Sequence, residues 1–481
     1  MTEKLYQAYN AENFRKQGHA LVDLLADHLD QTTTGQSKKT IDWNKPEDEL
    51  EFWSSYAKES HPTPDFFKTV LSRSIALHHP NYMGHQVSPA LPVSALSMML
   101  SGLLNNGSAV YEMGMANTAL EKIVVDTIAG AIGFDQEADG ILTSGGTLAN
   151  LTALLCARHV KSSKDVWNDG HKDALAIMVS AEAHYCVDRA AKIMGLGDKG
   201  IIKVPVNERY SIATDQLQEC YDAAVQKGLT VIAVVGSAPS TSTGMHDDLS
   251  ALSEFSKKND LWFHVDGAHG GAAVFSKKYK HLVNGINQAD SVVIDGHKMM
   301  MTSSIATALV FKNGDDSYKT FQQKADYLWG SQQDKEWYTM AKRTFECTKS
   351  MMALRFYSII NEYGTAIFDD YVTTCYDQAK VLAGLIEERS DMELFLPPDT
   401  NIICFRYIDA PSDLRNELNK KIRSALLNEG TFYIVETTIR EIHYLRVTVM
   451  NPFSARGHFN TLLDQISKLG HHFSTQREGI K

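Results

Sequence analysis

The stretch Leu229–Gly296 contains three short apolar runs, LTVIAVVGS (229–237), LWFHVD (261–266) and SVVIDG (291–296). Each run has the length and the apolar composition of a buried strand. The segment Leu249–Lys258, between the first two runs, has the length of a helix. Strands that alternate with helices are typical of a mostly parallel sheet covered by helices. We therefore expect an α/β fold.

The alternation continues on both sides of this stretch. Residues 174–180 (ALAIMVS), 201–206 (IIKVPV) and 306–311 (ATALVF) are further predicted strands, and Thr214–Lys227 is a further predicted helix. Together they predict a central sheet within a large domain of residues 86–365. Active sites in such sheets gather at the carboxyl ends of the strands.

The two flanks of this domain have different patterns. Residues 12–30 predict one amphipathic helix in an N-terminal helical arm of residues 1–85, and the polar residues 31–51 predict a loop. Its proposed apolar face contains Phe14, Leu21, Leu24, Leu25 and His28. Helices at 371–389 and 412–428 and strands at 402–407 and 444–450 predict a smaller C-terminal α+β domain of residues 366–481.

Composition excludes several classes of protein. The 481 residues carry a net charge of -11 without a Lys/Arg cluster, which disfavours nucleic acid or an anionic membrane as a partner. No apolar run approaches the roughly 20 residues of a membrane span. The start, MTEKLYQAYNAENFRKQ, resembles neither a signal peptide nor a transit peptide. Six scattered cysteines lack metal-site spacing, so we expect reduced thiols, no metal and a cytoplasmic location.

A first chemical signal is the segment Thr143–Asn150, TSGGTLAN, which precedes the helical run LTALLCARHV. Adjacent glycines let backbone N–H groups approach an anion, and a helix N-terminus adds unpaired donors and a favourable dipole. The segment therefore indicates a phosphate site. In isolation, a Gly-Gly pair before a helix is more often an ordinary turn.

Two further signals follow predicted strands. Asp266, in HVDGAHGG, can pair with a protonated ring nitrogen of a cofactor, although it can equally cap the next helix. Lys298, in DGHKMM, lies among apolar residues, where a lysine can lose its proton and form a Schiff base. Most lysines at strand ends simply extend to water. The order of the three signals along the chain favours the chemical interpretation of all three.

The three motifs in this order resemble the group II pyridoxal-phosphate decarboxylases, which include glutamate, aromatic-amino-acid, cysteine-sulfinate and diaminobutyrate decarboxylases. The resemblance covers nearly the whole chain and extends to FRKQGHALVDLLADHL, HPNYMGHQVSPALP, AEAHYCVDRAAKIMGLG, STSTGMHDDL and LRVTVMNP. It implies the fold type I, aspartate aminotransferase-like fold and pyridoxal 5'-phosphate as cofactor. The implied reaction is α-decarboxylation of an L-amino acid to an amine and carbon dioxide, as in glutamate decarboxylases.

The resemblance also implies roles for individual residues. Lys298 matches the lysine that holds the cofactor covalently, Asp266 the partner of the pyridine nitrogen, and His184 the imidazole stacked on the ring. Ala268 would lie against the opposite ring face, and His297 precedes the lysine as in the family. The phosphate would contact Gly145, Gly146, Thr147 and Ser242.

Substrate contacts are implied in the same way. Arg446 matches the arginine with which glutamate decarboxylases hold a substrate carboxylate, a role suited to a bidentate guanidinium. Tyr338, nine residues before Cys347, lies in a segment that resembles the family's mobile loop and is the expected general acid. His85 falls where glutamate decarboxylases have glutamine. Arg446 could instead be a surface arginine at the start of a strand, and Tyr338 an aromatic residue that anchors the loop.

The family also implies a homodimer whose N-terminal arm wraps around the partner. Residues near His85, Gln86, Tyr111 and Glu112 would then face the substrate. Two departures from the family pattern are Gly267, where many members have alanine, and Asp295, where several have asparagine. Asp295 would add a negative charge near the phosphate. Other reactions of the same cofactor, namely aldehyde synthesis, transamination or lyase chemistry, stay open, as does an inactive binding protein.

Overall fold

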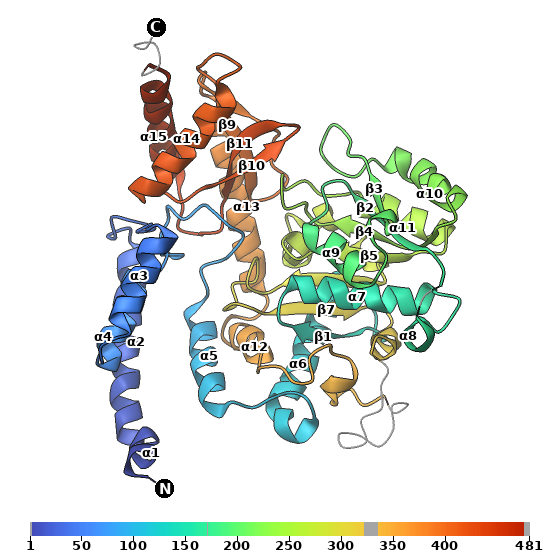
Figure 1. The fold of residues 1–481 in the computed structure, drawn as a ribbon, viewed down its shortest axis with the longest axis horizontal. Coiled ribbons are helices and arrows are strands. Elements are labelled where there is room, and N and C mark those ends of the chain that lie inside the picture. Colours follow the sequence, from blue (N-terminus) through green and yellow to red (C-terminus); the bar gives the residue numbers. More distant parts are fainter. Residues whose placement is uncertain (1, 171, 322–334, 476–481) are drawn as a thin grey trace. The chain divides into compact units, whose positions relative to one another are not determined.

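The computed structural model describes residues 2–170, 172–321 and 335–475 (Figure 1). They form two compact units. The larger unit contains Gln86–Lys380 and Leu396–Ile403, and the smaller unit contains the N-terminal residues to His85, Val381–Phe395 and the C-terminal residues from Cys404. Within the described residues, no helix has both the length and the apolar character needed to cross a membrane.

A seven-stranded sheet forms the centre of the larger unit, in the order β1-β7-β6-β5-β4-β2-β3. β7 is antiparallel to both β1 and β6, whereas the pairs β2–β3, β2–β4, β4–β5 and β5–β6 are parallel. The strands are β1 (Asp139–Thr143), β2 (Leu175–Ser180), β3 (Ile201–Val204), β4 (Thr230–Ser237), β5 (Trp262–Asp266), β6 (Ser291–Asp295) and β7 (Thr307–Phe311). The mostly parallel α/β fold predicted from the sequence is confirmed.

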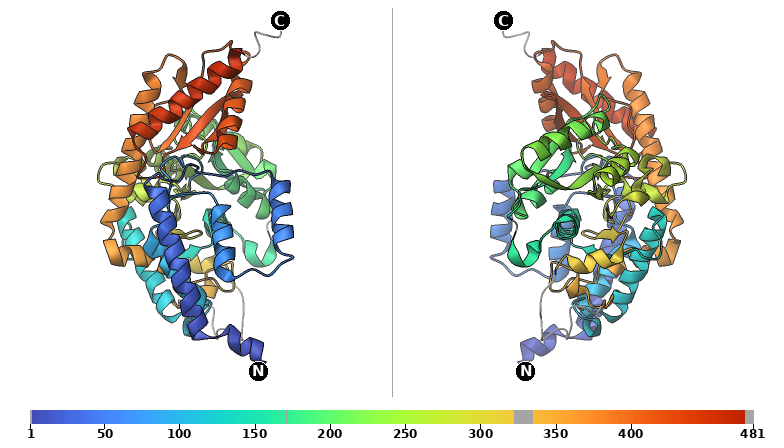
Figure 2. Two further views of the ribbon diagram at one scale, coloured as in Figure 1. Left: turned by 90° about the vertical axis from the view of Figure 1, so that its left-hand side faces the viewer. Right: turned by 90° about the vertical axis from the view of Figure 1, so that its right-hand side faces the viewer.

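Helices cover both faces of this sheet, as Figure 1 and Figure 2 show. Neighbouring residues of a strand point to opposite faces. Val235 packs in a core cluster with residues of α7 (Gly146–Lys161) and α9 (Tyr185–Ile193). A Cβ atom on the next residue, Gly236, would lie within 3.0 Å of Leu249 and Leu252 on α11 (Leu249–Lys258). Burial on both faces explains why the strands read as continuous apolar runs.

The remaining helices of the larger unit surround this core. They are α5 (Pro92–Leu104), α6 (Tyr111–Ile132), α8 (Val166–Asp169), α10 (Leu217–Gln226), α12 (Ala353–Tyr363) and α13 (Ala366–Glu387), which continues into the smaller unit. α12 packs against both α5 and α6.

The smaller unit has a four-stranded sheet in the order β10-β11-β9-β8. β8 pairs antiparallel with β9, and β10 with β11. The strands are β8 (Met392–Leu394), β9 (Ile402–Tyr407), β10 (Val435–Ile439) and β11 (Ile442–Thr448). Its helices are α1 (Glu3–Ala8), α2 (Ala11–Thr33), α3 (Pro46–Tyr56), α4 (Thr63–Ser72), α14 (Arg415–Glu429) and α15 (Arg456–Thr475).

Two local predictions need correction. The predicted loop at 31–51 is wrong at both ends, since α2 continues to Thr33 and α3 begins at Pro46. Proline is well suited to the first turn of a helix, and the acidic residues that follow Pro46 stabilise its N-terminus. The sequence reading also missed β1, whose apolar part, Ile141 and Leu142, is too short to stand out.

A buried ion pair supports the end of β1. Lys349 donates to Glu121 and to the carbonyl oxygen of Leu142 at 2.7 Å, while the Leu142 N–H donates to Glu121 at 2.8 Å. The side chains of Lys349 and Glu121 are 2% and 0% exposed. Burial lowers the pKa of Lys349, against the opposing charge of Glu121. The pair thus holds the strand that leads into Thr143 and the glycine turn.

We expect Glu121→Gln to lower the free energy of unfolding by about 3–5 kcal/mol, because it leaves the Lys349 charge buried without its counterion. Denaturant unfolding followed by circular dichroism measures this change. The matched control is Glu417→Gln, which breaks a solvent-exposed pair with Lys420 and should leave the midpoint close to that of the unmodified protein. Equal midpoints for all three proteins would contradict a stabilising role of the buried pair.

Candidate active site

A cavity of about 280 Å³ lies at the carboxyl ends of the central strands of the larger unit. β5 ends at Asp266 and β6 at Asp295, and both carboxylates line this cavity. The other lining residues follow β1, β2, β4, β5 and β6: Ser144, Gly145, Gly146, Thr147, Asn150, His184, Cys186, Pro239, Thr241, Ala268, His269, His297, Lys298 and Ile305. Parallel strands thus deliver residues from distant parts of the sequence to one edge.

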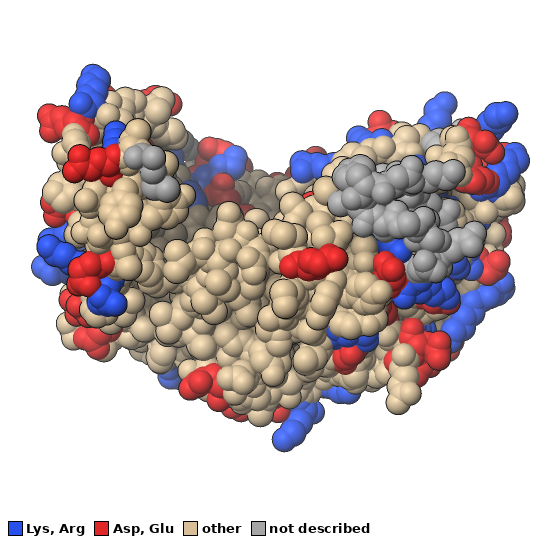
Figure 3. All heavy atoms as spheres, turned by 90° about the horizontal axis from the view of Figure 1, so that it is seen from below, with Lys and Arg blue, Asp and Glu red and all other residues tan. Residues whose placement is uncertain are grey.

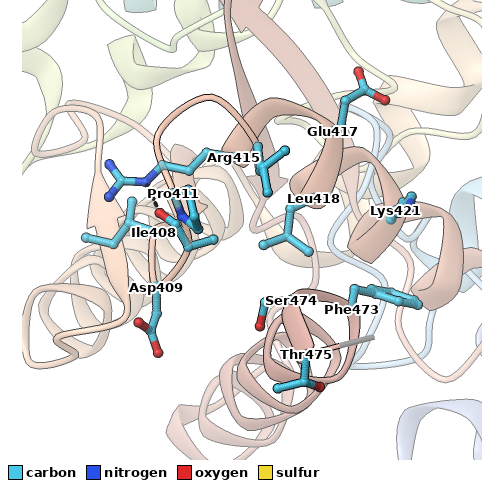
Figure 4. Close-up of a pocket in the computed structure, with 12 residues that line it drawn as sticks. Ile408, Asp409, Pro411, Arg415, Glu417, Leu418, Lys421, Phe473, Ser474 and Thr475 are labelled. Carbon is cyan, nitrogen blue, oxygen red and sulfur yellow. Dashed lines mark hydrogen bonds between the residues drawn. The ribbon is translucent and has the colours of Figure 1, made fainter. Parts of the chain in front are cut away.

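A larger cavity, of about 810 Å³, lies within the smaller unit and is shown in Figure 4. Leu418 and Phe473 line it, and the Arg415 guanidinium donates to the carbonyl oxygen of Ala410 at 3.0 Å. Its charged residues, Asp409, Arg415, Glu417 and Lys421, come from one connecting turn and α14. The smaller cavity at the sheet edge is the better catalytic candidate, because it combines a lysine, two buried carboxylates and a histidine.

The glycine turn before α7 forms one wall of the cavity. Gly145 has φ +118°, a conformation that favours glycine, and it caps α7 without a side-chain hydrogen bond. A Cβ atom on Gly146 would lie 3.0 Å from Asp295 Oδ1 and 3.5 Å from Ala268 Cβ. The N-terminal N–H groups of this 16-residue helix therefore border the cavity without a side chain in the way. Such a helix end fits a phosphate group.

Lys298 makes an ion pair inside the cavity. Its Nζ lies 2.9 Å from Asp295 Oδ2, and the Thr307 hydroxyl donates to Asp295 Oδ1 at 2.5 Å. Burial acts to lower the pKa of Lys298, but the charge and hydrogen bond of Asp295 outweigh burial, so the pKa is raised. Burial acts to raise the pKa of Asp295, but Lys298 and His297 lower it.

Asp266 and His184 face the same cavity. The Asp266 side chain accepts from the backbone N–H of Ala268 at 3.2 Å, and the residue is 9% exposed. His184 Nδ1 accepts from the Cys186 N–H at 3.3 Å and so caps α9. Burial lowers the pKa of His184, with opposing effects from Asp266, which raises it, and Lys298, which lowers it. The imidazole is therefore neutral near pH 7.

This set of side chains fits pyridoxal phosphate: an amine for its aldehyde, a carboxylate for its ring nitrogen, a flat imidazole and a glycine turn for its phosphate. Residues 64–408 match the family described as the pyridoxal-dependent decarboxylase conserved domain. The chain belongs to this family.

Individual relatives agree with this assignment. The decarboxylase is 26% identical to an aromatic-L-amino-acid decarboxylase of Bacillus atrophaeus over 92% of each chain. It is also 26% identical to a human acidic amino acid decarboxylase, over 91% of this chain and 87% of the relative. The crystal structure of mouse CSAD has the same fold, with a TM-score of 0.88, 22% identity and coverage of 96% and 99%.

The family and these relatives confirm three predictions made from the sequence. The protein is a pyridoxal-phosphate-dependent carboxy-lyase, pyridoxal 5'-phosphate is its cofactor, and it decarboxylates amino acids. Within the part of the chain that the structure describes, no group of three His, Cys, Asp or Glu side chains could hold a metal ion.

The decarboxylase contains a buried hydrogen-bond chain that sequence reasoning missed. His264 Nδ1 lies 2.8 Å from the Ser291 hydroxyl, and His264 Nε2 lies 2.7 Å from Asn150 Oδ1. The Asn150 amide then donates to Cys186 Sγ at 3.4 Å. Burial lowers the pKa of His264 to about 4, which keeps the ring neutral. A usable signal was the spacing of His264 two residues before Asp266, which places both on one face of β5.

Two residues expected near the cofactor have other contacts. Ser242 donates to Glu182 Oε2 at 2.7 Å, and its neighbour Thr241, rather than Ser242, lines the cavity. His297 lies with Nδ1 3.1 Å from the Ala306 carbonyl oxygen and Nε2 3.7 Å from Asp295 Oδ2. His297 thus lies beside the ion pair and contacts the backbone that leads into β7.

Tyr338 lies in the larger unit but outside the residues that line the cavity. Its ring packs edge-on against Tyr111 with 5.8 Å between centroids. Its hydroxyl hydrogen-bonds Glu336, whose carboxylate also lies 3.0 Å from the Nζ of Lys342. Lys342, with a fully buried side chain, anchors this segment.

His85 and Arg446 belong to the smaller unit. Arg446 lies on β11, opposite Val435, and is 6% exposed. Burial lowers the pKa of Arg446. Burial also lowers the pKa of His85, and the charges of Arg446 and Arg423 lower it further. The surroundings of His85 are therefore electrically positive.

Proposed function

We propose that this decarboxylase binds its cofactor through Lys298, Asp266, His184 and the glycine turn. The observation that carries the proposal is the meeting of these residues in one 280 Å³ cavity. Lys298 supplies the amine for covalent attachment. When bound, pyridoxal phosphate withdraws electrons from the bond that breaks at the substrate's α carbon.

Each remaining contact has a defined task. Asp266 holds a proton on the pyridine nitrogen, because a buried carboxylate favours the cationic form of a base beside it. His184, neutral and fixed as the cap of α9, would stack on one face of the ring, and Ala268 would lie against the other face. The phosphate would be held by the cavity-wall residues Gly145, Gly146 and Thr147, together with Ser242 next to the lining residue Thr241. His297, beside Lys298, would complete the cofactor site.

We propose that the substrate is an L-amino acid with an acidic side chain. Such a substrate ranks slightly ahead of diaminobutyrate and of aromatic amino acids. Arg446 would hold a substrate carboxylate with two parallel hydrogen bonds. His85 would contact the substrate too. The positive surroundings of His85, produced by Arg446 and Arg423, favour an anion there. One relative's name also specifies acidic amino acids, whereas another's specifies aromatic ones.

The experiment that tests this proposal is a release screen. Purified holoenzyme is incubated with each common amino acid and with several non-protein ones, and amine, carbon dioxide, ammonia and oxygen are measured. We expect equimolar amine and carbon dioxide with an acidic substrate, without ammonia or oxygen uptake. Ammonia, aldehyde or keto-acid formation as the main result would identify a different reaction of the same cofactor, and activity on none of the compounds would refute decarboxylation.

Tyr338 is the proposed general acid that protonates the substrate's α carbon after carbon dioxide leaves. Tyr338→Phe should reduce amine formation on the order of 10²-fold. It should also raise the ratio of aldehyde to amine, because the unprotonated carbon stays open to oxygen. The control is Tyr363→Phe on α12, whose ring has comparable exposure, 47% against 37%. An unchanged product ratio and rate for Tyr338→Phe would assign the tyrosine to loop packing alone.

We further propose that the protein is a cytoplasmic homodimer. Each chain would have three parts: an N-terminal arm of residues 1–85, a cofactor-binding domain of residues 86–365 and a C-terminal domain of residues 366–481. All six cysteines are free, which fits a reducing compartment.

Figure 3 shows a broad uncharged area on the face seen from below. On α5 the exposed large apolar residues are Leu96, Met98, Met99, Leu100, Leu103 and Leu104, each 36–66% exposed. Apolar area of this kind fits a subunit interface, and sedimentation equilibrium should give twice the chain mass.

A further inference from the structure

Asp295 is a buried carboxylate in the cofactor cavity for which the proposed chemistry has no task. It is the last residue of β6 and is 2% exposed. One oxygen accepts from Thr307 at 2.5 Å, and the other lies 2.9 Å from Lys298 Nζ and 3.7 Å from His297 Nε2. Both oxygens also lie within 3.2 Å of the Cβ position of Gly146. The carboxylate therefore connects the glycine turn to the lysine.

The position of Asp295 matters because an amine attacks an aldehyde only in its neutral form. The ion pair with Asp295 favours the ammonium form of Lys298 over the neutral amine. Four other titratable groups face the pair. Asp266 and Cys186 also raise the pKa of Lys298. His184 lies beside Lys298, and His297 lies beside Asp295. Of the anionic groups, Asp295 exerts the largest effect on Lys298.

We propose that Asp295 controls cofactor capture by holding Lys298 as an ammonium ion, so that covalent attachment waits for the ion pair to open. This inference rests on the proposed role of Lys298 as the attachment residue. Thr307 fixes the carboxylate, which prevents it from turning away from the lysine. Asp295 thus slows attachment and makes its rate depend on pH.

The step balances without any other reactant. The Lys298 ammonium group first gives up one proton to solvent, and the neutral nitrogen attacks the aldehyde carbon. A C=N double bond replaces the C=O bond, and the aldehyde oxygen leaves as water. Both hydrogens of the neutral amine leave in this water, and the imine nitrogen takes one proton back from solvent, so the net charge of the reactants and products is equal.

The test measures how fast full-length apoprotein captures pyridoxal phosphate, followed by absorbance and confirmed by borohydride reduction and peptide mass. With the unmodified protein we expect the rate to rise up to about tenfold per pH unit between pH 7 and 9, as the neutral amine fraction rises. With Asp295→Asn, which can still accept the hydrogen bond of Thr307, we expect capture at pH 7 to be faster by on the order of tenfold or more.

The matched control is Asp290→Asn, which removes a half-buried carboxylate directly before the other end of β6, where its side chain accepts from the Phe263 N–H. Its capture rate should equal that of the unmodified protein. Asp295→Ser serves as a second variant and should also be faster. Pyridoxal, which lacks the phosphate, separates an effect on the lysine from an effect on the phosphate.

Acceleration of both pyridoxal phosphate and pyridoxal by Asp295→Asn supports the inference. Acceleration confined to pyridoxal phosphate would assign the effect to charge repulsion with the phosphate and overturn the inference. Slower capture by Asp295→Asn, or an equal gain in Asp290→Asn, would also overturn the inference. Lys298→Ala separates the attachment role of Lys298 from the control of attachment by Asp295. A covalent adduct in Lys298→Ala would refute the attachment role itself, whereas its absence, combined with no gain in Asp295→Asn, refutes only the role of Asp295.

Discussion

Lys298→Ala should reduce amino acid decarboxylation by on the order of 10³-fold or more, because the variant has no amine to hold the cofactor. The cofactor would then bind only through its phosphate and ring contacts. Initial rates of carbon dioxide release with saturating cofactor measure the loss. Circular dichroism and the unfolding midpoint check that the variant is folded at the assay temperature, because the substitution leaves Asp295 buried without its counterion.

Two further variants make this result specific. Lys298→Arg keeps a positive charge at the position where the native Nζ lies 2.9 Å from Asp295. A guanidinium stays protonated, however, and cannot attach the cofactor. It should lose as much activity as Lys298→Ala. Lys319→Ala, which removes a half-exposed lysine, should retain full activity. More than a tenth of the original rate in Lys298→Ala would exclude Lys298 as the attachment residue.

Asp266→Asn should lower kcat by on the order of 10²–10³-fold and leave KM nearly unchanged. The amide has the shape of the carboxylate but no charge, so it cannot hold a proton on the pyridine nitrogen. The side chain can still accept from the Ala268 N–H, an interaction of 3.2 Å in the structure. Steady-state kinetics over a range of substrate concentrations separates the two constants.

The control for Asp266→Asn is again Asp290→Asn, because Asp290 is a half-buried acid that also accepts a backbone N–H. Its kcat should match that of the unmodified enzyme. If Asp266→Asn raised KM without lowering kcat, Asp266 would act in substrate binding, and a protonated ring nitrogen would not be its task. A large loss of bound cofactor in Asp266→Asn would instead place its main effect in cofactor affinity.

The sequence predicts those residues of the site that directly follow a strand. Asp266 ends β5, and Lys298 stands three residues after the end of β6. The glycine turn follows β1, although β1 itself was missed. Since carboxyl ends of parallel strands meet at one edge, reading the motifs in chain order was enough to expect them together. The order of strands in the sheet was not needed.

The hydrogen-bond chain through His264 could not be predicted in this way. It joins Asn150, His264 and Ser291, which are 114 and 27 residues apart in sequence. Their contact depends on β5 lying next to β6, where His264 pairs with Ser291, and on α7 crossing the same face. Strand order and helix placement follow from packing of the whole core, which no local pattern records.

The sequence by itself determined the α/β class, the family, the cofactor and the reaction, because periodicity and short motifs are local properties of the chain. The tertiary structure decided the protonation states in the site. Burial keeps His264 and His184 neutral, and the ion pair with Asp295 keeps Lys298 charged. A pKa depends on desolvation and on nearby charges, and both exist only after the strands have come together.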